Sequence, residues 1–170
     1  VLGRARGEKG SALEKTLDSA LGPVCSVILV TGAGGMFGGV LRASGIGDAL
    51  ANTLGGIGVP VILACFLISL ILRVAQGSAT VALVTTAGLM SATVVSGGFN
   101  GVQLAAIVIA TAAGSVAASH VNDSGFWLVG RLMGMDVATT LRTWTVMETA
   151  ISVIGFALSA IVFYGAGMFG

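Results

Sequence analysis

The chain reads RVAQGSAT at residues 73–80, a polar, small-residue segment between two apolar runs, residues 59–72 and 81–95. As a helix, the first run would reach about 21 Å, which is less than the ~30 Å hydrocarbon core of a bilayer. Two short apolar limbs around a polar tip favour a re-entrant hairpin. Two ordinary spans joined by a loop at residues 73–78 remain the alternative reading.

A second polar interruption reads HVNDSG at residues 120–125. It follows an apolar run at residues 102–119 and precedes a shorter one at residues 126–133. Because the shorter run cannot span a bilayer alone, we interpret the three segments as one discontinuous helix. A polar loop at residues 134–142 then leads to a final span at residues 143–169.

The composition requires lipid as the main solvent. Hydrophobic residues make up 55% of the 170 residues, charged residues only 9%, and the mean hydropathy is +1.03. So few charges cannot cover a water-exposed surface. The 27 glycines suit close helix packing and broken helices in membranes. The net charge of +1 gives no argument for a nucleic acid partner.

The N-terminal part divides into a polar segment, residues 1–22, and an apolar segment, residues 23–41. The first is predicted to be a linker or an amphipathic helix at the membrane surface, and the second the first span. Six of the eight positive residues fall on one side of the predicted topology, which is then cytoplasmic: Arg4, Arg6, Lys9, Lys15, Arg131 and Arg142. The chain starts at Val1 rather than Met, so we expect a fragment of a longer protein.

The hairpin tip offers hydrogen-bonding groups at membrane depth. Gln76, Gly77, Ser78 and Thr80 supply an amide, hydroxyls and accessible backbone. The second limb begins here, and free N–H groups at a helix N-terminus bind carboxylates. We therefore predict substrate contacts at these four residues, with an ordinary helix cap as the alternative. Arg73 either adds a positive charge to the site or neutralises a nearby acid.

The helix break places His120, Asn122, Asp123 and Ser124 in succession. Polar groups at this depth need partners, and an intramembrane carboxyl is a candidate for carrying a coupling proton. We predict that Asn122 and Ser124 bind substrate and that Asp123, with His120, takes the proton. A structural hydrogen-bond network is the alternative. His120 and Asp123 would share a face if helical. For Glu148, we favour an interfacial position paired with Arg131 or Arg142.

Three blocks of this sequence resemble the gluconate permease family. They read VTGAGGMFGGVL at residues 30–41, followed by SGIG at 44–47, then RVAQGSATVA at 73–82 and SHVNDSGFW at 119–127. The resemblance runs from about residue 12 to the C-terminus. It implies gluconate:proton symport, in a family that also includes idonate and D-serine carriers.

The resemblance also implies the architecture of a broad ion-transporter superfamily. Its members have two inverted repeats, each with a re-entrant hairpin and a broken helix that meet at the substrate. Residues 23–170 would form a membrane transport domain, mostly the second repeat. The other half of the site would lie in a missing N-terminal half. The tip lacks the Ser-Asn-Thr sequence frequent in relatives, so their sodium sites are not carried over.

We therefore expect an all-α, multi-pass protein of the bacterial inner membrane that takes up a sugar acid with protons and needs no cofactor. Its partners would be the sugar acid, the lipid bilayer and the missing half, and whether it forms a homo-oligomer stays open. A carrier for D-serine or another small acid, and an uncoupled channel or structural subunit, are the alternatives. GIGD at residues 45–48 resembles a motif of intramembrane aspartyl proteases, but that chemistry needs a second aspartate at matching depth. The sequence offers no suitable one, so we do not expect an enzyme.

Overall fold

The structure is a computed structural model that describes residues 58–168 continuously, together with scattered residues before them. The scattered residues are 10–12, 14–15, 17–18, 21, 25, 28–29, 36, 40, 43–45 and 53. The predicted N-terminal linker or surface helix and the predicted first span, residues 1–22 and 23–41, therefore lie largely outside the described residues.

From residue 58 to residue 168, every regular element is a helix, which confirms the predicted all-α class for this part of the chain. The elements are α4 (Val61–Gln76), α5 (Ala79–Ser96), α6 (Gly101–Val116), α7 (Ser124–Leu132), α8 (Val137–Thr140), the π-helical turn η1 (Leu141–Thr145) and α9 (Val146–Met168).

The connection between α4 and α5 is shorter than predicted. Helix α4 continues to Gln76, so the polar tip shrinks from residues 73–80 to Gly77 and Ser78. Gly77 ends α4 in the left-handed conformation (φ 77°), and its N–H donates to the Arg73 carbonyl oxygen. The Ser78 hydroxyl accepts from the N–H of Val81 and starts α5. The polar character of Arg73 and Gln76 does not end the helix, because both residue types have good helix propensity.

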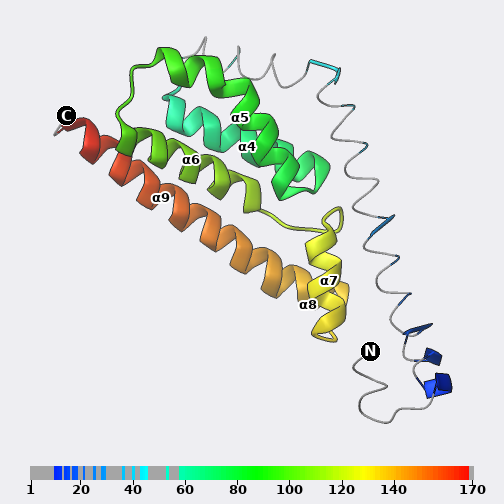
Figure 1. Ribbon diagram of the computed structural model, residues 1–170. Helices are drawn as coiled ribbons and strands as arrows, with labels where there is room; N and C mark the ends of the chain where they lie inside the picture. The colour runs from blue at the N-terminus through cyan, green and yellow to red at the C-terminus, as the bar shows by residue number, and fades with distance from the viewer. Residues whose placement is uncertain are drawn as a thin grey trace.

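Helix α6 packs against α4 on one side and α9 on the other, and α5 packs against α4 (Figure 1). The apolar core around this contact consists of Ile62, Ala64, Cys65, Ile68, Leu72, Ala106, Ile107 and Ala110. Gly114 brings α6 close to α4, since a Cβ there would lie 2.4 Å from the carbonyl oxygen of Phe66. Close approach at a small residue is the packing expected of membrane helices.

The last helical segment starts earlier than the sequence suggested. Residues 137–142 are helical, so the predicted polar loop at residues 134–142 is wrong from residue 137 onward. Asp136 accounts for the difference, because its carboxylate accepts from the N–H of Thr139 at 2.8 Å and caps α8. Within the described residues, the segment Val137–Met168 is the one helix long and apolar enough to cross a membrane. Helices α4 and α6 are apolar but shorter.

Candidate functional site

The α4–α5 connection touches the segment between α6 and α7. At Gly77, an added Cβ would lie 2.1 Å from the backbone carbonyl oxygen of Asn122. The Asn122 side chain in turn donates through Nδ2 to the Val74 carbonyl oxygen at 2.8 Å. The two polar interruptions of the sequence are therefore in direct contact, and only glycine fits at the point where they meet.

The segment from Ala117 to Asp123, here called the break, is not helical. Ala118 has a positive φ of 51°, and the Asp123 N–H donates to the His120 carbonyl oxygen at 2.8 Å, forming a turn. The helix resumes where the Asp123 carboxylate accepts from the N–H of Gly125 at 2.9 Å. Because the break is not helical, the condition for a shared face of His120 and Asp123 is not met, and His120 Nδ1 lies 2.7 Å from the Ala118 carbonyl oxygen.

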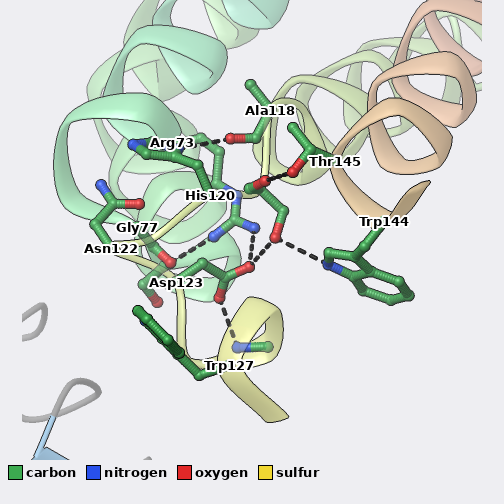
Figure 2. A network of polar contacts seen from close by, with 12 residues as sticks. Arg73, Gly77, Ala118, His120, Asn122, Asp123, Trp127, Trp144 and Thr145 are labelled. Atoms are coloured by element: carbon green, nitrogen blue, oxygen red, sulfur yellow. Dashed lines mark hydrogen bonds and ion pairs between the residues drawn. The ribbon is translucent and has the colours of Figure 1, made fainter. Parts of the chain in front are cut away.

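A buried ion pair joins α4 to the break. Arg73 Nη2 lies 2.5 Å from Asp123 Oδ2, and the two side chains are only 3% and 11% exposed. Figure 2 shows the guanidinium between the Asp123 carboxylate and the Gly77 carbonyl oxygen, to which Nη1 donates at 2.5 Å. The Ser119 hydroxyl donates to the same carboxylate oxygen as Arg73. Arg73 therefore does neutralise a nearby acid, as one of the two readings of the sequence held.

One face of the last helical segment, Val137–Met168, forms hydrogen bonds with the break. Trp144 Nε1 donates to the Ser119 hydroxyl at 3.0 Å, and the Thr145 hydroxyl donates to the Ser119 carbonyl oxygen (Figure 2). The Ala118 N–H donates to the Thr149 hydroxyl at 3.2 Å. The last two of these bonds satisfy backbone groups of Ala118 and Ser119 that have left the α6 hydrogen-bond ladder.

Residues 1–164 match the sequence profile of the GntP family permeases. The chain belongs to the GntP permease family. This confirms the resemblance drawn from the three sequence blocks. Since the family consists of permeases, it also confirms that the chain is not an enzyme and that it belongs in a membrane.

The relatives of this GntP permease chain are transport proteins by name. It is 49% identical over 154 residues to the inner membrane permease YgbN of Escherichia coli (strain K12), with 89% of this chain and 34% of the relative covered. It is 45% identical over 144 residues to the low-affinity gluconate transporter of the same organism (85% and 32% covered). It is 40% identical over 155 residues to the Gnt-II system L-idonate transporter (91% and 35%). The chain spans about a third of the length of these relatives. No solved structure matches it.

The predicted substrate-contact residues of the GntP permease chain differ in burial and in hydrogen bonding. Gln76 is buried, and its Nε2 has no hydrogen-bond partner among the described residues; the same holds for Oδ1 of Asn122. Ser78 and Ser124 are half-buried at the starts of α5 and α7. Thr80 is exposed on α5.

Sequence reasoning missed the contribution of α9 to the site. Glu148 does not pair with Arg131 or Arg142, because the single salt bridge among the described residues joins Arg73 to Asp123. Glu148 is half-buried and interacts electrostatically with both members of that pair. The missed signal was helical spacing, which puts Trp144, Thr145, Glu148, Thr149 and Ser152 on one polar face of an otherwise apolar segment.

Proposed function

We propose that this chain is part of a secondary active transporter that takes up gluconate or a related sugar acid with protons across the bacterial inner membrane. The relatives named as gluconate and L-idonate transporters favour this substrate class. The single observation that carries the proposal is the meeting of the α4–α5 connection and the break at a buried ion pair. Ionisable groups buried at membrane depth are characteristic of substrate and proton pathways.

The substrate would bind beside the start of α5. Gln76, Gly77, Ser78, Thr80, Asn122 and Ser124 are its proposed contacts. Two observations support this position. The N-terminus of α5 presents backbone N–H groups, and the buried Gln76 Nε2 and Asn122 Oδ1 lack partners among the described residues. Buried polar atoms are rarely left without a partner, so an amide donor and an amide acceptor of this kind favour a polar ligand.

Asp123 is the proposed proton carrier, and His120 is its proposed helper. Asp123 sits at the junction of three elements, since it contacts Arg73 of α4, caps α7 and accepts from Ser119 in the break. A change in its charge would therefore act on α4 and α7 together. This coupling between protonation and helix position is what alternating access requires.

The proposed membrane arrangement follows from the helix lengths. Helices α4 and α5 would form a re-entrant hairpin, α6 and α7 a discontinuous span, and α9 a full span. Together these elements would make up the second of two inverted repeats. The other repeat would complete the substrate site. Helix α4 supports this reading, because its 16 residues reach about 24 Å, which is short of the bilayer core.

The test is uptake of labelled gluconate by inner-membrane vesicles that contain a full-length permease carrying this chain. Saturable uptake that collapses when a protonophore dissipates the proton gradient is the expected result. Saturable uptake of L-idonate or D-serine, but not gluconate, would move the substrate within the class of small acids. A gluconate flux that does not saturate, with no accumulation of gluconate in the vesicles, would indicate a channel and would contradict the proposal.

A further inference from the structure

Arg73 is the one buried lysine or arginine among the residues that the structure describes. Its side chain is 3% exposed, whereas Lys15, Arg131 and Arg142 are exposed. An anion that enters a low-dielectric site needs a desolvated cation or several oriented donors as its partner. Within this part of the chain, Arg73 is therefore the group best suited to hold a carboxylate, and Asp123 already occupies it.

The Arg73 guanidinium is hydrogen-bonded on two sides and has a further N–H donor available. Nη1 donates to the Gly77 carbonyl oxygen and Nη2 to Asp123, while Nε has no partner among the described residues. The bond to Gly77 anchors the guanidinium to the end of its own helix. Arg73 would therefore keep its position if the Asp123 carboxylate moved away. Nε2 of Gln76, which also has no partner in the part of the chain that the structure describes, is a further donor on the same helix.

We propose that the substrate carboxylate replaces Asp123 on Arg73 and that protonation of Asp123 permits the exchange, an inference that rests on the proposed function. A proton from water adds to a carboxylate oxygen of Asp123, and the ion pair to Arg73 breaks. The carboxylate of the sugar acid then forms the equivalent charge-assisted bonds to the guanidinium, which stays protonated. One positive and one negative charge remain buried before and after the exchange, so neither state contains an unpaired ion.

The surrounding groups can hold a protonated Asp123. The Ser119 hydroxyl now donates to the carboxylate and accepts from Trp144 Nε1. A hydroxyl both donates and accepts, so it can receive the new O–H of the acid by rotating. The carboxyl keeps a second oxygen to accept from the N–H of Gly125, which preserves the cap of α7.

Among the described residues, two other titratable groups have to be considered. Glu148 approaches from α9 and interacts with both Arg73 and Asp123, and His120 lies in the break itself. Either one is a rival source of pH dependence. The experiment therefore has to separate protonation of Asp123 from protonation of Glu148 or His120.

The test uses the full-length permease in proteoliposomes, with labelled gluconate as the probe and counterflow exchange as the readout. For the wild type, the apparent KM should rise with pH, by up to tenfold per unit, because one proton is taken up with each anion. Asp123→Asn leaves Arg73 free at every pH, so exchange should persist with a flat pH dependence. Arg73→Gln should lose exchange, and Arg73→Lys should keep the charge but raise the KM. The exposed Arg142→Gln is the matched control and should behave as the wild type does.

The double variant Arg73→Gln/Asp123→Asn separates binding from structure, since it contains no unpaired buried charge. If Arg73 binds the substrate, exchange stays lost in the double variant. If the pair is only a structural bridge, the double variant exchanges as well as Asp123→Asn, and the inference is overturned. A wild-type pH dependence that persists in Asp123→Asn overturns it too, and assigns the titration to Glu148 or His120. Absence of any wild-type gluconate transport would instead refute the proposed function, and the inference with it.

Discussion

Gly77→Ala should separate the α4–α5 connection from the break. The new methyl group would lie 2.1 Å from the carbonyl oxygen of Asn122, which is more than 1 Å closer than ordinary contact. Both atoms belong to backbone-defined positions, so rotation of a side chain cannot relieve the overlap. We expect about 1–2 kcal/mol from the left-handed conformation and about 1–3 kcal/mol from overpacking. Transport should fall further than stability, because a shift of about 1 Å in a positioned group costs roughly 100-fold in rate.

Gly98→Ala is the control for this experiment. Gly98 also has a positive φ, 66°, but none of the described residues lies within 4 Å of an added Cβ. Gly98→Ala should therefore carry the cost of the left-handed backbone conformation without a steric overlap. The assay compares thermal unfolding and gluconate uptake of the two purified variants. Equal losses of stability and unchanged uptake in both variants would refute the contact between Gly77 and the break.

Three further predictions concern the scaffold. Gly114→Ala should destabilise the α4–α6 contact, whereas Gly155→Ala, whose Cβ would meet its neighbour at 3.4 Å, should not; thermal unfolding of both variants tests this. Trp144→Phe removes the hydrogen-bond donor to Ser119 in the break and should lower the free energy of unfolding by about 1 kcal/mol. Unfolding in denaturant measures this, and an unchanged free energy would contradict it. Just before the last span, hydrogen bonds from Thr139 lower the pKa of Asp136. A lowered pKa stabilises the fold above the unfolded value of about 3.9, and this contribution is lost as pH falls through the folded value. The destabilisation by Asp136→Asn should therefore be present at pH 7 and fade below about pH 4, and an equal effect at both pH values would contradict it.

The sequence predicted the helical class and the two polar interruptions because both depend on local composition. Apolar runs in lipid form helices, since each helix satisfies its own backbone. The run at residues 102–119 and the HVNDSG interruption correspond to α6 and the break, which starts three residues earlier than expected, at Ala117. The predicted helix ends were less accurate where a single residue decides them. Asp136 extends the last helical segment, and Gly77 rather than Arg73 ends α4.

The composition of the site depended on tertiary contacts that periodicity does not reveal. Nothing in the sequence favoured Asp123 over Glu148 as the partner of Arg73, since both acids lie far from it along the chain. The deciding contact is the close approach at Gly77, which brings the end of α4 onto the break. The role of Trp144 was hidden for the same reason. A tryptophan near the end of an apolar run suggests a membrane interface, yet its N–H reaches Ser119.

The buried polar groups argue for more than a structural bridge. An ion pair between α4 and the break needs no additional donors, yet seven buried side-chain atoms lack partners among the described residues: Ser69 Oγ, Arg73 Nε, Gln76 Nε2, Thr85 Oγ1, Thr86 Oγ1, Asn122 Oδ1 and Ser152 Oγ. Three of these seven atoms belong to α4, where Ser69 lies one helical turn before Arg73 and Gln76 lies nearly one turn after it. Lipid offers no hydrogen bonds, and natural interiors rarely leave such groups unpaired. Buried hydrogen-bonding groups without partners among the described residues, on the helix that carries Arg73, favour a ligand site over a purely structural salt bridge.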